Sequence, residues 1–239
     1  DKELFNNALE SLKVLFSCPI HLTYQNSKFD TSIDGINYHS FVGPHPAGLS
    51  SVHISHIYPV NLKRVAWTIG FQDVISLGYL LKNKTIRTHK TIALAGPSVF
   101  DPSLISARIG GNLDELSAGK VKANTRVISG SVLFGHSSEG VMTYLGNYDS
   151  LISAIPDEAN DIFMNWLMPG KNLHSKLNIF SSSFFTPNEF VFNTSLNGGD
   201  RAIVPVGSYE EVLPMDILVT QLLTIYLNDF YPPLKSLHL

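Results

Sequence analysis

Cysteine is almost absent from this chain of 239 residues, which contains Cys18 alone. One thiol cannot close an internal disulfide, complete a cysteine-rich zinc site or ligate an iron–sulfur cluster, because each of these needs two or more thiolates. A chain without internal disulfides is typical of a reducing compartment. We therefore expect a cytoplasmic location and no metal or redox centre bound by this chain.

Charged residues are also scarce, at 15% of the chain against about 25% in average soluble domains. The net charge is −3, and the 17 lysines and arginines are scattered along the sequence. Nucleic-acid binding requires basic residues clustered against phosphates, so we expect no nucleic-acid partner. The low charge predicts surfaces that face neighbouring domains or subunits.

Phosphate-binding motifs and membrane spans are missing as well. Neither the Gly-x-Gly-x-x-Gly fingerprint nor the Walker A pattern occurs, so we expect no dinucleotide or nucleotide site. The longest apolar stretch, residues 212–227, contains polar side chains and is shorter than the roughly 20 residues of a spanning helix. Because the chain begins with charged residues other than Met, we expect a piece of a longer protein without a secretory signal.

Hydrophobic periodicity predicts three regions. Residues 1–88 are expected to form a partial Rossmann-like α/β domain, and residues 89–147 a β-grasp module similar to an SLBB domain. Residues 148–239 are expected to hold linker strands and a helical domain that resembles an iron–sulfur domain without ligands. The predicted helices cover residues 2–16, 71–81, 112–116 and 217–226, and the predicted strands cover residues 19–24, 65–69, 91–95, 105–109, 126–134, 151–155 and 179–185.

Two local patterns add detail to these elements. Asn112 followed by Glu115 is a capping-box pattern at a helix start. The stretch from Gly135 to Gly140 has a serine near two glycines, but its spacing differs from the hydrolase nucleophile elbow, which needs Gly-x-Ser-x-Gly. We interpret that stretch as a hairpin connection and predict no catalytic residue.

Four histidines, His39, His45, His53 and His56, lie within 18 residues. Such a cluster could bind zinc, but a strand over residues 52–58 would place His53 and His56 on opposite faces, so we predict no metal site. The histidines either line a loop that faces a ligand or a partner protein, or are ordinary hydrogen-bonded side chains. Both possibilities stay open, and the stretch from Gly43 to Gly48 is expected to form a rigid loop.

A spacing typical of ferredoxin clusters lies near the C-terminal end of the chain. The pattern Cys-x2-Cys-x2-Cys-x3-Cys-Pro falls on Ile203, Val206, Tyr209 and Leu213, with Pro214 after them. None of these apolar or aromatic side chains supplies the thiolate that a ferredoxin cluster needs. The spacing alone could occur by chance. The surrounding sequence, with Arg-Ala before it, Pro214 after it and a helix start beyond, makes a relation to cluster sites more convincing.

Over this and seven further segments, the chain resembles the A subunit of the bacterial sodium-translocating NADH:quinone oxidoreductase. The order and spacing agree from about residue 2 to residue 239, and the matching segments are residues 43–60, 71–75, 93–97, 113–119, 126–133, 144–146, 166–171 and 198–216. The resemblance implies kinship with redox subunits that have a Rossmann-like domain, a β-grasp module and a cluster-binding domain. It also implies that apolar packing at Ile203, Val206, Tyr209 and Leu213 replaces the cluster.

The resemblance implies a function for the whole complex: electrons pass from NADH through flavins and iron–sulfur centres in other subunits to ubiquinone, coupled to sodium export. The protein would be peripheral, on the cytoplasmic side of the bacterial inner membrane, and would contact the membrane-embedded B subunit. It would bind no redox cofactor and would not be catalytic alone. The expected contacts with quinone or with the membrane partner are Gly43, His45, Gly48, His53 and His56, because loops on a rigid scaffold carry function.

Two alternatives stay open. The chain could be a purely structural scaffold that assembles the complex without contacting quinone. It could also be an independent β-grasp module that binds a soluble ligand.

Overall fold

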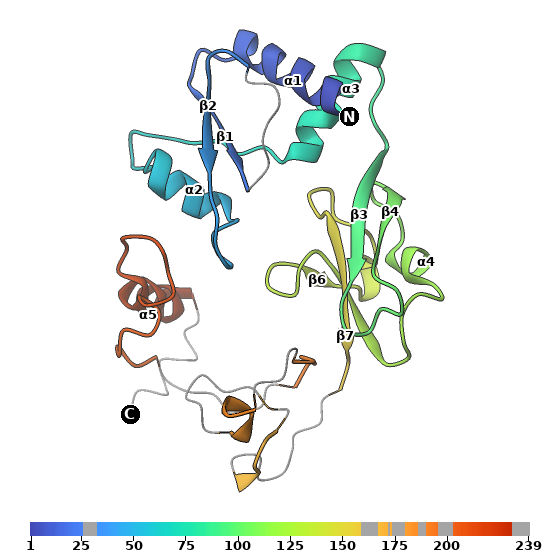
Figure 1. Ribbon diagram of the computed structural model, residues 1–239, viewed down its shortest axis with the longest axis vertical. Helices are drawn as coiled ribbons and strands as arrows, with labels where there is room; N and C mark the ends of the chain where they lie inside the picture. Colours follow the sequence, from blue (N-terminus) through green and yellow to red (C-terminus); the bar gives the residue numbers. More distant parts are fainter. Residues whose placement is uncertain are drawn as a thin grey trace. The chain divides into compact units, whose positions relative to one another are not determined.

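The computed structural model describes residues 1–25, 33–158, 167–171, 173, 180–185, 190–195 and 203–230. The chain divides into two compact units, one of residues 1–86 with 200–239 and the other of residues 87–199. Figure 1 shows the elements of each unit. Sheets and helices occur in both, which confirms the mixed α/β class, whereas the Rossmann-like and iron–sulfur-like details stay predictions.

The first unit combines helices with a small parallel sheet. Its elements are α1 (Lys2–Leu15), β1 (Ile20–Tyr24), β2 (Ile36–Ser40), α2 (Ser50–Ile57), α3 (Phe71–Asn83) and α5 (Val219–Phe230). Strands β1 and β2 pair in parallel, with Ile20 opposite Ile36 and Tyr24 opposite Ser40. In Figure 1 the two strands lie side by side, with α1 along one end of them.

The core of this unit lies between the sheet and the helices α1 and α3. Successive strand residues point to opposite faces, and one face of the sheet presents apolar side chains to the helices. The buried residues of this core are Ala8, Leu9, Ile36 and Val74, and Ile20, Leu22 and Tyr38 pack against them. The predicted helices at residues 2–16 and 71–81 are confirmed. The apolar side chains that predict each helix lie on the face that is buried in this core.

The backbones of helices α1 and α3 lie close together at Gly78. A Cβ placed on Gly78 would lie 1.9 Å from the backbone carbonyl oxygen of Leu4, well inside van der Waals contact. The same pair of helices is joined at the surface by Lys82 Nζ and Glu3 Oε1, which are 2.8 Å apart. The glycine therefore sets how near the two helices can lie.

Replacing Gly78 with alanine should destabilise this unit. The obstacle is backbone rather than a flexible side chain, so the helices must separate, and we expect a loss of about 1–3 kcal/mol despite the better helix propensity of alanine. Urea unfolding of Gly78→Ala measures the loss. Gly48→Ala is the matched control, because nothing lies within 4 Å of its added Cβ; equal stabilities of the two variants would contradict this account.

The second unit is built on one mixed sheet. Its elements are β3 (His89–Ala95), β4 (Ser103–Arg108), α4 (Leu113–Ser117), β5 (Thr125–Ser129), β6 (His136–Ser137) and β7 (Leu151–Pro156), with a 3-10 turn, η1 (Gly140–Met142), after β6. The strand order is β4-β3-β7-β5-β6. Only the β3–β7 pair is parallel. The buried core consists of Ile92, Leu94, Val99, Ala107, Leu113, Leu145, Ile152 and Ala154.

Helix α4 begins as the sequence predicts. The side-chain oxygen of Asn112 accepts hydrogen bonds from the backbone N–H groups of Asp114, at 2.8 Å, and Glu115, at 3.4 Å. These are N–H groups at the helix start that have no partner inside the helix. The cap therefore fixes where α4 begins and holds Leu113, which is fully buried, in the core.

Loss of this cap should cost a modest amount of stability. We expect Asn112→Ala to lower the free energy of unfolding by about 1 kcal/mol, because the two N–H groups lose their acceptor. Thermal unfolding followed by circular dichroism measures the change. The matched control is Asn112→Asp, which keeps an oxygen at the same place and should retain most of the stability; a loss as large as that of alanine would argue against the cap.

Some predicted strands are wrong, and the strand considered for residues 52–58 does not form. These residues belong largely to α2, where Val52 is buried, because a short apolar run does not distinguish strand from helix. Residues 65–69 form no strand, and Val65 and Trp67 are exposed, since β-forming residues need a partner strand. Of residues 179–185, the described part is the 3-10 turn η3 (Ser181–Ser183) with its flanking residues, and Ile179 lies outside the described residues.

The hairpin between β5 and β6 also differs from the prediction. The strand expected to reach Phe134 ends at Ser129, because Gly130 has a φ of +94° and the chain turns there. The hydroxyl of Ser131 then accepts hydrogen bonds from the N–H groups of Leu133 and Phe134. The turn thus precedes Gly135, and part of the predicted connection is strand β6.

Strand β7 occupies the centre of the sheet. The sequence places a strand at Leu151–Ile155 but assigns it to a linker. In the structure it pairs with both β3 and β5. Its alternate residues Ile152 and Ala154 are fully buried, as expected of a central strand. The assignment to a linker is therefore corrected, while the domain boundaries themselves stay predictions.

The late helix is confirmed with a shifted start, since α5 begins at Val219 rather than Ile217. Within the part of the chain that the structure describes, no helix is long and apolar enough to cross a membrane.

Candidate ligand cleft beside strand β1

The first unit contains an open cleft of about 900 Å³ along β1. Its walls come from α1, from every residue of β1, from the segment that follows β2, and from the start of α3. Most of the lining is apolar, including Phe5, Leu9, Leu22, Phe41, Phe71 and Val74. A concave, largely apolar site with a few polar groups is typical of small-molecule binding.

Three of the five predicted contact residues meet at this cleft. Gly43, Gly48 and His53 line it, whereas His45 and His56 are not among its lining residues. Around these positions the loop folds back on itself, with the N–H of Ala47 donating to the carbonyl of Pro44 at 2.9 Å. The structure therefore brings together part of the predicted set.

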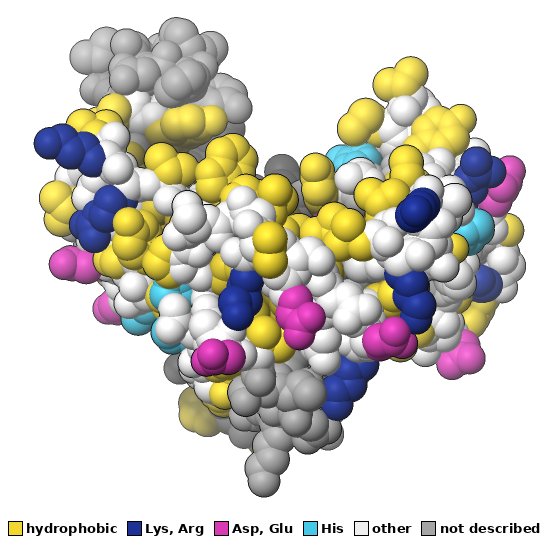
Figure 2. All heavy atoms as spheres, turned by 90° about the horizontal axis from the view of Figure 1, so that it is seen from above, with side chains coloured by type: hydrophobic (Ala, Val, Ile, Leu, Met, Phe, Trp, Pro, Cys, Tyr) yellow, Lys and Arg dark blue, Asp and Glu magenta, His cyan; other side chains and the backbone are white. Residues whose placement is uncertain are grey.

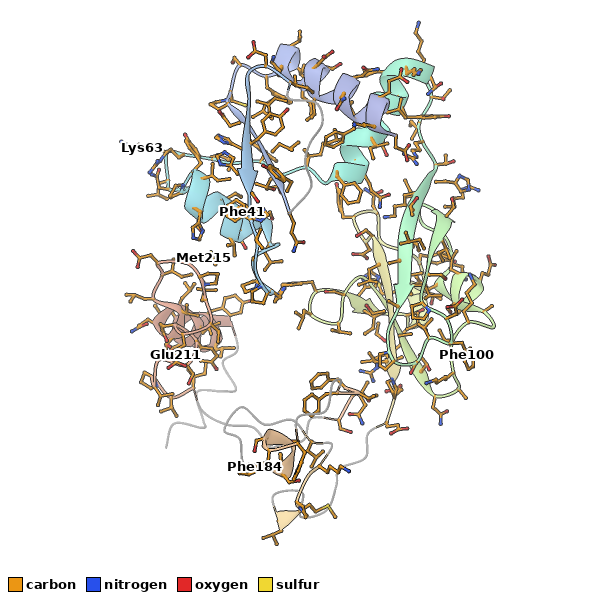
Figure 3. The ribbon with its side chains drawn as sticks, viewed as in Figure 1. Phe41, Lys63, Phe100, Phe184, Glu211 and Met215 are labelled. Carbon is orange, nitrogen blue, oxygen red and sulfur yellow. The ribbon has the colours of Figure 1, made fainter. Side chains whose placement is uncertain are left out.

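The imidazole of His53 has a defined hydrogen-bonding pattern. Its Nε2 lies 2.8 Å from the carbonyl oxygen of Ala47, and a carbonyl oxygen only accepts, so Nε2 carries the hydrogen. In the neutral ring Nδ1 is then an acceptor. The ring centroid of Phe41 lies 4.3 Å from that of His53, which fixes the plane of the imidazole; Figure 3 labels Phe41 just after β2.

His56 is tied to its own helix. Its Nδ1 lies 2.9 Å from the carbonyl oxygen of Val52, so Nδ1 donates and Nε2 of the neutral ring is the acceptor. Its ring meets Phe41 edge-on, with centroids 6.1 Å apart. His53 and His56 are thus both hydrogen-bonded side chains, and only His53 also faces the cleft.

His39 does not join the loop histidines. It lies on β2, and its Nε2 is 3.0 Å from Nδ1 of His21 on β1. His21 also lines the cleft. The sequence patterns did not predict this pair because they did not predict β2; a parallel pairing of the two strands would have placed both histidines on one face of the sheet.

The His21–His39 pair affects protonation. Partial burial, and secondarily the neighbouring His39, lower the pKa of His21 below its ordinary value. Burial disfavours the charged imidazole, and a second positive charge nearby disfavours it further. The pair therefore resists taking up two protons.

This shift predicts an acid-sensitive unit. Below about pH 6.5 the unfolded chain takes up a proton at His21 that the folded unit resists, so the free energy of unfolding falls as the pH decreases. We expect His21→Gln to reduce the loss measured between about pH 7.5 and about pH 5.5 in urea unfolding. His89→Gln, in the other unit, serves as control; an unchanged pH dependence in His21→Gln would contradict the assignment.

Among the residues that the structure describes, no group of three or more His, Cys, Asp or Glu side chains is placed to hold a metal ion. At the predicted cluster positions, Val206 is 69% exposed and Tyr209 40% exposed, in a series of turns over residues 206–212. Both side chains lie at the surface of the described residues, and apolar packing in place of a cluster stays a prediction. Ile203 and Leu213 are half-buried.

Both units match known family models. Residues 1–86 match the model described as the NqrA second alpha/beta domain, and residues 91–140 match the NQRA C-terminal domain. The chain thus combines an α/β domain with a stretch of a second, C-terminal domain of the same family of proteins.

The curated relatives identify the family. Proteins named as the A subunit of Na(+)-translocating NADH-quinone reductase are 42% identical over 93% of this chain in Rhodopirellula baltica, 45% over 80% in Pseudomonas aeruginosa and 38% over 93% in Yersinia pseudotuberculosis. These matches cover 50%, 43% and 51% of the relatives. The chain belongs to the family of these A subunits and spans about half the length of the relatives it matches.

Proposed function

We propose that this chain is part of a peripheral subunit of a sodium-pumping NADH:ubiquinone reductase, where it contributes to quinone binding and to assembly of the complex. The names of its relatives support a place in such a complex. The cleft beside β1 supports the contact with quinone, and it is the observation that carries the proposal.

The cleft suits the chemistry of a quinone. A quinone ring is flat and apolar, with two carbonyl oxygens that accept hydrogen bonds, and the cleft offers apolar walls with few polar groups. His53 is held in plane by Phe41 and by its bond to Ala47. Its Nδ1 accepts from a quinol hydroxyl when the ring is neutral and donates to a quinone carbonyl when the ring is protonated.

The glycines and the other histidines have supporting roles in this proposal. Gly43 and Gly48 line the cleft, and the space around Gly48 is open, so a flat ring can approach the backbone there. His45 and His56 would shape the loop or contact the membrane-embedded B subunit. In this proposal His53 provides the polar contact, and the backbone at the two glycines leaves room for the quinone ring.

The other parts of the complex carry the redox groups in this proposal. NAD, flavins and iron–sulfur centres are placed in other subunits; for the clusters this agrees with the single, exposed cysteine of this chain, since a ferredoxin-type cluster needs several thiolates. The protein would lie on the cytoplasmic side of the bacterial inner membrane. Exposed apolar side chains support an assembly role: Trp67 is 94% and Val65 71% exposed, and Figure 2 shows hydrophobic side chains across much of the visible surface.

Variants of the cleft test the contact with quinone in the assembled complex. We expect His53→Ala to raise the KM for ubiquinone about two- to tenfold, the worth of one hydrogen bond, and Gly48→Leu to raise it further by filling the open space. Steady-state quinone reduction with NADH measures both. His89→Ala, in the other unit, is the control and should leave the KM unchanged.

The alternatives give different results. A complex that assembles normally, with an unchanged KM in both cleft variants and no saturable signal when the isolated protein is titrated with a quinone analogue, would show a purely structural scaffold. Isolation of the native protein free of membrane partners, with a soluble ligand bound, would show an independent β-grasp binding module.

A further inference from the structure

The two histidines on the open face of the β1–β2 sheet form a pair that the proposed function does not use. His21 Nδ1 and His39 Nε2 lie 3.0 Å apart, with ring centroids separated by 5.2 Å. Within the described part of the chain, no other side chain is hydrogen-bonded to either imidazole. The two nitrogens therefore face each other without competing partners.

The position of this pair follows from the register of β1 on β2. In the parallel ladder, His21 lies opposite Asn37 and Thr23 lies opposite His39. All four residues point to the sheet face opposite the apolar core, since side chains alternate along a strand. The histidines are diagonal neighbours on that face, held by strands whose other face is packed against α1 and α3.

The separation of the two nitrogens matches the spacing of two ligands on one metal ion. Imidazole nitrogens bind zinc at about 2.0–2.1 Å, which places two of them about 3.3 Å apart on a tetrahedral ion and about 2.9 Å apart at a right angle. The observed 3.0 Å lies between these values. The two rings are tilted by 34° to each other, and binding one ion requires them to turn so that both lone pairs meet at the metal.

We propose that His21 Nδ1 and His39 Nε2 chelate a divalent late transition-metal ion, with water completing its coordination. Imidazole ligands favour copper, nickel and zinc, and copper binds most strongly in this series. The hydrogen between the two nitrogens moves to the outer nitrogen of the same ring, so a neutral pair binds the ion without releasing a proton. Protonation of either ring competes with the metal.

Only two protein ligands take part, because no third His, Cys, Asp or Glu comes near them in the described residues. The site should consequently bind more weakly than a structural zinc site, which has four protein ligands. It also lies on the same unit as the quinone cleft, which His21 lines, yet the proposal does not depend on quinone binding.

Titration of the whole chain with Cu²⁺ tests the proposal. Isothermal calorimetry should show a saturable site, and His21→Ala or His39→Ala should each weaken it by about tenfold or more, since one of two ligands is lost. The electron paramagnetic resonance spectrum of bound Cu²⁺ should show hyperfine coupling to two nitrogens. His53→Ala and His89→Ala are controls and should leave this site intact.

Other outcomes overturn the proposal. A copper site that survives both single substitutions belongs to other histidines, and weak uptake that does not saturate shows no site at all. Circular dichroism checks that the variants fold. If His21→Ala unfolds, His39→Gln keeps the test valid, because it replaces one ring on the solvated face with a side chain of similar length; copper coupling to two nitrogens in His39→Gln would then reject the pair.

Discussion

The first unit depends on the contact between the Leu4 carbonyl and Gly78. No side chain fits between the two backbones, so helices α1 and α3 lie as close as their main chains allow. That distance lets Leu9 and Val74 pack against the same face of the sheet. It also sets the position of two cleft walls, because both residues line the cleft. The glycine therefore sets the distance between the two cleft walls that α1 and α3 provide.

The histidines of this unit have two kinds of hydrogen-bonding partner. His53 and His56 each donate to a backbone carbonyl of their own segment, which fixes the tautomer and leaves one acceptor nitrogen per ring. His21 and His39 face each other instead. A histidine bonded to a backbone carbonyl keeps one nitrogen free to exchange a proton with a ligand. Two histidines that face each other can instead share a metal cation.

The sequence predicted those elements that are determined by residues close together in the chain. The amphipathic spacing of α1 and α3 and the Asn112 cap of α4 are properties of a few neighbouring residues, and all three are confirmed. The residues of α2 fit a strand as well as a helix in sequence, because their short apolar run has no periodicity long enough to decide. β2 was missed and β7 was assigned to a linker, since the role of a strand depends on partners far away in the chain.

The same distinction applies to the site. The loop from Gly43 to Gly48 and His53 could be singled out from turn-forming residues and side-chain chemistry. The cleft itself could not, because it is made by α1, β1 and α3 together. The His21–His39 pair required the register of β1 on β2, which sequence alone did not provide.

The central claim, that quinone occupies the cleft beside β1, is tested most directly by amide hydrogen exchange of the chain with and without a short-chain ubiquinone. We predict slower exchange at residues 20–25 and 43–53, which line or adjoin the cleft, and unchanged exchange in β3 and β7 of the other unit. Exchange that is the same with and without quinone throughout residues 1–86, at saturating ligand, would contradict the claim.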